Sequence, residues 1–265
     1  MYSVSYQRAG TIAEAAKLLE AGDAAALSGG MTLIPAMKTR LSAPSTIVDL
    51  RHIPALKGIR ATGRRVTIAA ATTHAEVAAS AEVKGVCPAL CHLAAHIGDP
   101  HVRHMGTIGG SVANNDPAAD YPAALLAMEA TIVTNKRDIA ADQFFKGLFE
   151  TALEEGEIIT AVTFEAPDQA GYAKFPNPAS RYAMTGVFVA RRSGQVRAAV
   201  TGAGDDGVFR SAEVETALSR SFDPAALQGV SVPAGNLMGD IHASPEYRAN
   251  LIVVMAKRAV AQANG

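Results

Sequence analysis

Cysteine is scarce in this sequence, and clusters of one charge and long apolar runs are absent. The 265 residues include 2 cysteines, 24 Lys and Arg, and 25 Asp and Glu, which gives a formal net charge of −1. A nucleic-acid-binding protein would normally show a basic excess or stripe, so we expect no nucleic-acid partner. No stretch reaches the roughly 18–20 apolar residues that span a bilayer. No Lys/Arg block offers contact with an acidic membrane surface either.

The N-terminal segment, residues 1–8, is polar and has no apolar signal segment behind it. We therefore expect a cytoplasmic protein with no membrane span. Hydrophobic residues make up 49% of the chain and charged residues 18%, which predicts an ordered protein with a sizeable core. The length suits one large domain or two unequal ones.

The two cysteines, Cys87 and Cys91, lie four residues apart at a predicted helix. A disulfide at that spacing is awkward, and cytosolic thiols stay reduced, so we expect buried, inert thiols. An iron–sulfur cluster needs about four ligands. Any iron–sulfur chemistry linked to this protein would therefore reside on another chain.

Hydrophobic periodicity divides the chain near residue 170, in the turn-rich segment 167–171. Short strands mix with helices before this segment, and antiparallel strands followed by helices come after it. The pattern predicts an α+β protein with domains at residues 1–170 and 171–265. The expected helices cover residues 11–21, 73–80, 88–97, 121–128, 212–218 and 247–263, and the expected strands 46–50, 65–70, 131–133, 158–164, 173–177, 186–191 and 195–201.

Two glycine-rich loops carry the functional signal. Paired glycines let a backbone approach a ligand closely and adopt positive φ angles, and successive amides in such a turn form an anion-binding nest. The first loop has hydroxyls on both sides of its glycines, and so has the second. Either loop alone could be a structural turn. The first comprises Leu27, Ser28, Gly29, Gly30, Met31, Thr32, Leu33 and Ile34, and the second Thr107, Ile108, Gly109, Gly110 and Ser111.

A polar tail follows the second loop, with Asn114, Asn115, Asp116 and Asp120 around Pro117. These groups suit hydrogen bonds to ribityl, ribose or amide atoms, although apolar helix borders them. A nearly neutral protein with two such loops indicates a pyrophosphate ligand held mainly by backbone amides rather than by lysines.

Both loops and the tail resemble the flavin motifs of the FAD-binding subunits of molybdenum hydroxylases, a family that includes the medium chain of aerobic carbon monoxide dehydrogenase and the flavin domain of xanthine dehydrogenase. The first match runs over residues 28–38, and the second over 107–111 and 115–122. The resemblance covers nearly the whole chain. It implies a PCMH-type FAD-binding domain of two α/β subdomains, with the flavin between them, and a smaller C-terminal α+β domain with an antiparallel sheet.

The resemblance also implies roles for individual residues. Residues 27–34 and 107–111 would hold the pyrophosphate, and Asp116 and Asp120 lie in the stretch that would bind polar groups of the cofactor. Met31 stands in the first loop with no histidine there, so the FAD is expected to be non-covalent. Arg181 replaces the acidic residue that relatives often carry, and two histidines stand where relatives more often have amides before the second loop. The other expected contacts are Ile97 and Ile159 beside the flavin or adenine, Lys174 at the flavin's polar edge, and Tyr182 over the isoalloxazine.

The function implied is that of an electron-transfer subunit. Substrate would be oxidised at the molybdenum cofactor of a large partner subunit, and a small [2Fe-2S] subunit would carry the electrons to FAD on this chain. FAD would pass them to an external acceptor such as a quinone, NAD or oxygen. The chain itself shows no acid–base pair for substrate chemistry, as expected where the cofactor performs the redox step.

Three other readings compete. The segment Gly202–Gly207 matches G-x-G-x-x-G after a strand-like run, which would suit an NAD-dependent dehydrogenase. Two aspartates in that loop would repel a pyrophosphate, and the roughly 60 residues that follow are too few for a dinucleotide fold. His92 and His96 could share a helix face as metal ligands, but no H-E-x-x-H motif contains them, so we expect no metal site. A non-catalytic binding module is the third reading.

Overall fold

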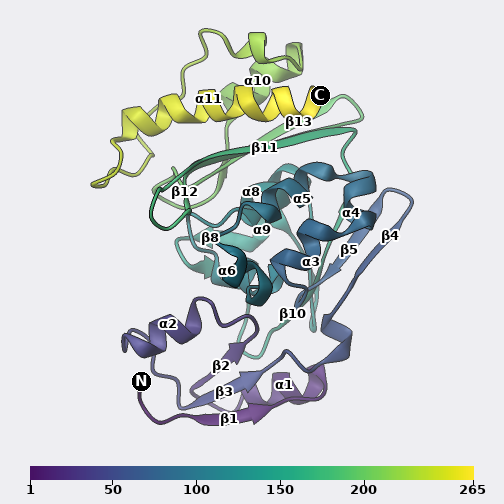
Figure 1. Cartoon of the computed structure of the whole chain (residues 1–265), viewed down its shortest axis with the longest axis vertical. Coiled ribbons are helices and arrows are strands. Elements are labelled where there is room, and N and C mark those ends of the chain that lie inside the picture. The colour runs from purple at the N-terminus through teal and green to yellow at the C-terminus, as the bar shows by residue number, and fades with distance from the viewer.

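The computed structural model describes the whole chain, residues 1–265, as three tiers along its long axis (Figure 1). The N-terminal tier is a parallel three-stranded sheet in the order β1-β3-β2. Its elements are β1 (Ser5–Arg8), α1 (Ile12–Leu19), β2 (Ala24–Leu27), α2 (Leu33–Lys38) and β3 (Thr46–Asp49). The first glycine loop connects β2 to α2.

The middle tier is a five-stranded antiparallel sheet, β4-β5-β10-β6-β7, packed with short helices. Its strands are β4 (Ile59–Thr62), β5 (Arg65–Ala69), β6 (Thr131–Thr134), β7 (Asp138–Ala140) and β10 (Ile159–Glu165). A small hairpin, β8 (Phe145–Gly147) and β9 (Glu150–Thr151), lies beside it. The helices are α3 (His74–Ala79), α4 (Ala81–Val86), α5 (Pro88–Ala95), α6 (Pro100–Met105), α7 (Ile108–Asn114), α8 (Tyr121–Ala127) and α9 (Ala141–Phe144).

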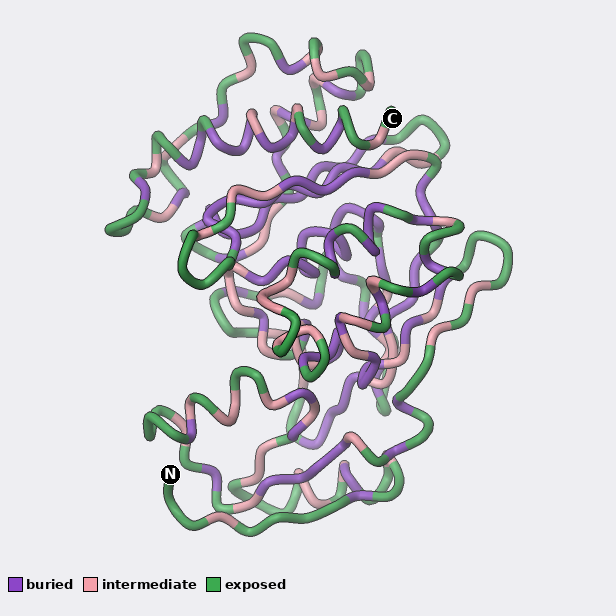
Figure 2. Tube along the Cα trace, in the orientation of Figure 1, coloured by how far each residue is buried: buried purple, intermediate pink, exposed green.

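The last tier is a four-stranded antiparallel sheet, β11-β12-β13-β14, crossed by the long helix α11 (Figure 1). Its elements are β11 (Gln169–Pro176), β12 (Ala183–Arg192), β13 (Gln195–Thr201), β14 (Phe209–Arg210), α10 (Ala212–Arg220) and α11 (Pro245–Asn264). β12 is buried along most of its length because α11 and α8 pack near it, and Figure 2 shows this buried interior between the tiers.

Apolar side chains form one large core and one smaller core in the middle and last tiers. The larger, of 32 residues, joins the middle helices and sheet and also takes in Tyr172 and Phe188 from the last sheet. The smaller, of 19 residues, lies between that sheet and α11. The last sheet is thus covered by apolar side chains on both faces, which is why most residues of β12 and β13 are buried.

The structure confirms the predicted α+β class with its antiparallel C-terminal sheet. Two local predictions are wrong. The second glycine motif is mostly helix α7 rather than a loop, since the Thr107 hydroxyl caps it and Ile108 and Val112 are buried on one face. Part of the expected turn 167–171 is already strand, because β11 begins at Gln169. The division into domains 1–170 and 171–265 stays a prediction.

No helix in the chain combines the length and the apolar character needed to cross a bilayer.

Gly171 of β11 packs directly against the backbone of α11. A Cβ at this position would collide with the Ala259 carbonyl oxygen of α11, and that backbone cannot move without lifting the helix. We predict that Gly171→Ala lowers the free energy of unfolding by at least about 1–3 kcal/mol, the usual cost of overpacking a core. Urea denaturation measures this. Gly235→Ala, where an added Cβ meets nothing within 4 Å, is the control; equal midpoints for the two variants would contradict the prediction.

Candidate cofactor-binding site

A cavity of about 660 Å³ lies where the N-terminal and middle tiers meet. That volume is within the roughly 300–1,000 Å³ typical of ligand sites. Its wall combines the first glycine loop, the second motif with its polar tail, the end of β5 with the start of α3, and the entry to β10. The β11–β12 turn reaches it from the last sheet. The lining segments include residues 26–33, 70–71, 97–98, 109–111, 153, 157–159 and 180–182.

The first loop presents unbonded backbone amides to this cavity. None of the amide nitrogens from Gly29 to Thr32 donates to an acceptor within the protein, and all four residues line the cavity. Gly30 adopts φ +71°, a conformation that glycine takes without steric cost. Consecutive free amides in such a turn suit an anionic ligand.

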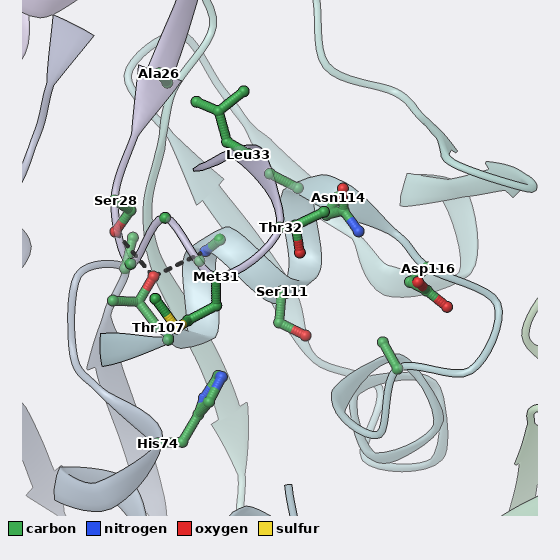
Figure 3. A pocket seen from close by; sticks show the side chains of 18 of the residues that line it. Ala26, Ser28, Met31, Thr32, Leu33, His74, Thr107, Ser111, Asn114 and Asp116 are labelled. Carbon is green, nitrogen blue, oxygen red and sulfur yellow. Dashed lines mark hydrogen bonds between the residues drawn. The ribbon is translucent and has the colours of Figure 1, made fainter. Parts of the chain in front are cut away.

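The second motif contributes differently, because its amides are already bonded. Ile108 N donates to Thr72 O at 3.0 Å, Gly109 N to Ala70 O at 2.9 Å and Gly110 N to Thr107 Oγ1 at 3.2 Å. Gly109 also allows close packing, because a Cβ there would lie 2.5 Å from that of Ala70. The motif therefore supplies a close-packed wall and the Ser111 hydroxyl, which Figure 3 shows among the side chains of the pocket.

The two motifs are held together by direct contacts. The hydroxyls of Ser28 and Thr107 lie 2.8 Å apart, as Figure 3 shows. Gly29 packs against the backbone of Met105 and Gly106 so tightly that a Cβ on Gly29 would collide with the Met105 carbonyl oxygen. The position of the free amides thus depends on a contact between segments nearly 80 residues apart in sequence.

Some residues of the polar tail after α7 line the cavity, and another stabilises the fold. Asn114 and Asp116 line the cavity, and burial raises the pKa of the Asp116 carboxyl. Asn115 instead holds the hairpin, because its amide nitrogen donates to the carbonyl oxygens of Gly147 and Glu150, both at 2.8 Å.

Asp120 is a buried carboxylate that joins the cavity wall to β11. Its Oδ1 accepts from Lys174 Nζ at 2.9 Å and from the Tyr172 hydroxyl at 2.5 Å. The Asp120 and Lys174 side chains are 4% and 6% exposed. Burial raises the pKa of the Asp120 carboxyl, and the Lys174 ammonium opposes that effect. Lys174 reaches the site through this contact and is not itself part of the cavity wall.

The charge around the cavity is unusual for an anion site. Arg181 is the one Lys or Arg among the lining residues, whereas three carboxylates, Asp116, Asp120 and Glu157, belong to it. Glu157 faces Arg137, with both guanidinium contacts at 3.1 Å. Burial alone would raise the pKa of Glu157, but hydrogen bonds from Arg137 and Thr134 lower it to about 2.

The cavity collects most of the residues that the sequence singled out. Three of them are not on its wall: Ile34 packs with the small core of the N-terminal tier, Ile108 is fully buried in the larger core, and Lys174 lies behind Asp120. Tyr182 lies on the wall and is 47% exposed. Those on the wall are Leu27, Ser28, Gly29, Gly30, Met31, Thr32, Leu33, Ile97, Thr107, Gly109, Gly110, Ser111, Asp116, Asp120, Ile159 and Tyr182. Their contacts with a cofactor stay predictions.

Sequence reasoning missed His74, Ala70 and Leu153, which also line the cavity. His74 stands next to Thr72 and Thr73 without a glycine or a repeated motif to mark it. These three residues reach the cavity only because β5, α3 and the entry to β10 converge on the second motif. The sequence signal for such convergence is absent.

The alternative nicotinamide site at Gly202–Gly207 finds no support. This loop links β13 to β14 and is absent from the cavity wall. Its first amide, Gly202 N, donates to Pro117 O at 2.8 Å, and Asp205 N donates to Asn236 O at 3.2 Å. A Cβ on Gly202 would collide with the Ala183 carbonyl oxygen. The glycines therefore serve close packing and a turn.

Comparisons with known proteins agree on one family. Residues 2–166 match the model of the FAD binding domain in molybdopterin dehydrogenase. The chain is 36% identical to the carbon monoxide dehydrogenase medium chain of Afipia carboxidovorans, over 98% of this chain and 96% of that one. It is 32% identical to the nicotine 6-hydroxylase medium subunit of Paenarthrobacter nicotinovorans, over 98% and 97%. A chain of reconstituted CO dehydrogenase from Oligotropha carboxidovorans superposes with a TM-score of 0.87 at 32% identity, covering 99% and 98%.

Ionisation of Glu157 makes the stability of the fold depend on pH. Its folded pKa of about 2 lies below the ordinary value of 4.5, so the ionised carboxylate stabilises the fold above about pH 4.5, and this contribution is lost as pH falls toward 2. We predict that Glu157→Gln lowers stability at pH 7 and that its difference from the unaltered protein shrinks between pH 5 and pH 3. Urea titrations at several pH values measure this. A difference that stays constant over that range would contradict the prediction.

The buried pair of Asp120 and Lys174 makes a double-mutant cycle informative. Lys174→Met leaves a buried carboxylate without its cation, and we predict a loss of about 3–5 kcal/mol of unfolding free energy. Adding Asp120→Asn to Lys174→Met removes the uncompensated charge and should recover part of that loss. Urea denaturation of the four proteins measures the coupling. Strictly additive single-variant effects would show that the pair is not coupled.

Proposed function

Since this chain belongs to the FAD-binding family of the molybdopterin dehydrogenases, we propose that it is the electron-transfer subunit of a heterotrimeric molybdenum hydroxylase and holds FAD, non-covalently, in the cavity between the glycine motifs. In this proposal a large subunit carries the molybdenum cofactor and a small subunit carries the [2Fe-2S] clusters. The acceptor is external: a quinone, NAD or oxygen.

The observation that carries the FAD site is the row of free amides from Gly29 to Thr32. A pyrophosphate carries two negative charges, yet Arg181 is the one Lys or Arg on the wall. Such an anion is therefore met by backbone dipoles and hydroxyls. The cavity volume and its apolar patches, which include Ile97 and Ile159, suit the rings of a dinucleotide. The residues present thus fit the cofactor.

The chain's own residues bind, orient and shield the cofactor. The first loop would hold the pyrophosphate, and Asp116 and Asp120 would accept hydrogen bonds from polar groups of the ribityl–flavin part. Tyr182 stands half-exposed at the turn between β11 and β12, where a ring can cover one part of the flavin and leave another open to a partner. The cofactor, when bound, would supply the redox chemistry, since a flavin can take up single electrons and store two. Substrate choice would reside in the molybdenum-containing subunit, as the differing names of the relatives suggest.

The test is FAD binding by the purified chain, followed by its visible absorbance. We expect flavin bands that persist through gel filtration, and no hydroxylase activity without partner subunits. Gly29→Ala should weaken FAD binding by at least tenfold, because the added Cβ pushes the first loop from Met105 and displaces its amides. Gly235→Ala, in open space, should bind like the unaltered chain.

Two outcomes would overturn the proposal. A chain that retains no FAD but binds NAD tightly would not be a flavin subunit, whatever its fold. Substrate turnover by the isolated chain would contradict its role as an electron-transfer subunit. Equal FAD affinity in the Gly29→Ala and Gly235→Ala variants would show that the protein binds FAD without the first loop.

A further inference from the structure

His74 is a buried histidine on the cavity wall. It is the first residue of α3, and its backbone N donates to Gly106 O at 2.9 Å. Its ring lies against Gly106, where an added Cβ would come within 2.6 Å of Nε2. In Figure 3 the ring points from α3 toward Met31 and Thr107. The imidazole therefore faces the place where the two glycine motifs meet.

The imidazole of His74 has no partner within the protein. Its Nδ1 is buried without a hydrogen bond, and no protein group bonds to Nε2. The ring of Tyr121 lies beside it, with centroids 5.4 Å apart, and the Tyr121 hydroxyl is also buried and unbonded. Buried polar groups in folded proteins almost always have a partner. His74 lines the cavity, whereas Tyr121 is fully buried, so Nε2 of His74 is the unbonded atom that a ligand in the cavity can reach.

The surroundings keep this imidazole uncharged. Burial, and then the Arg103 guanidinium on α6, lowers the pKa of His74 to about 4. A neutral imidazole carries a hydrogen on one nitrogen and a lone pair on the other. His74 can thus donate a hydrogen bond without adding a positive charge to the cavity.

Resting on the proposed function, we propose that His74 hydrogen-bonds the bound dinucleotide through Nε2, at the pyrophosphate held by the first loop. The wall offers this anion one guanidinium, that of Arg181, and three carboxylates, so each neutral donor counts. Nε2 is the ring atom beside Gly106, immediately before the second motif. Nδ1 faces inward and is sealed from the cavity.

Three substitutions test which nitrogen is used. The amide of glutamine can take the place of Nε2 and that of asparagine the place of Nδ1, whereas leucine offers neither. In FAD titrations of the cofactor-free chain followed by flavin fluorescence, His74→Leu and His74→Asn should raise the dissociation constant by about tenfold or more, as for a lost hydrogen bond to a charged group. His74→Gln should stay within about threefold. The control is His104→Leu on the exposed side of α6, which should bind like the unaltered chain.

The thermal midpoints of the cofactor-free variants separate folding from binding. If His74→Leu binds FAD as tightly as the unaltered chain, the proposal is overturned. If His74→Leu does not fold, the Gln and Asn variants decide, and equal affinities for these two would also overturn it. Failure of the unaltered chain to bind FAD would contradict the proposed function itself, which is a different result.

Discussion

The contact between the two glycine motifs is the constraint on which the cavity depends. Gly29 meets the backbone of Met105 and Gly106, and the Ser28 and Thr107 hydroxyls bond across the same contact. A side chain at Gly29 would force the motifs apart. The contact brings the N-terminal tier against the middle tier and holds the first loop in a turn whose amides point to no protein acceptor. The fold and the proposed anion site therefore depend on the same contact.

A second constraint follows from the carboxylates around the cavity. Each would oppose an anion if it projected freely, but two are compensated within the protein. Glu157 is neutralised by Arg137, and Asp120 by Lys174. Both cations approach from behind the wall, since neither residue lines the cavity. These two carboxylates are thus balanced by cations outside the wall, and in the proposed site the charge of the cofactor would be met mainly by neutral donors.

The sequence predicted the parts of the site that lie in contiguous motifs, and less of the parts that depend on tertiary convergence. The free amides of the first loop followed from paired glycines between hydroxyls. The helical state of Ile108–Asn114 did not, since two glycines argued against a helix that Thr107 capping and burial nevertheless stabilise. Lys174 contacts the cavity wall only through Asp120, and His74 lines the cavity from a helix that carries no motif. Neither contact can be predicted from the spacing of residues in the sequence.

In the motif at Gly202–Gly207, the glycines allow close backbone approach, but they use it for packing within the protein and not for binding a nucleotide. Gly202 donates to Pro117 O, and the Thr201 hydroxyl bonds to the carbonyls of Pro117 and Ala119. Arg248 of α11 in turn donates to Gly202 O at 2.7 Å. The close backbone approach that glycine permits is therefore used to clamp the polar tail, which carries Asp116 and Asp120, onto the last sheet. The C-terminal tier supports the cavity without lining most of it.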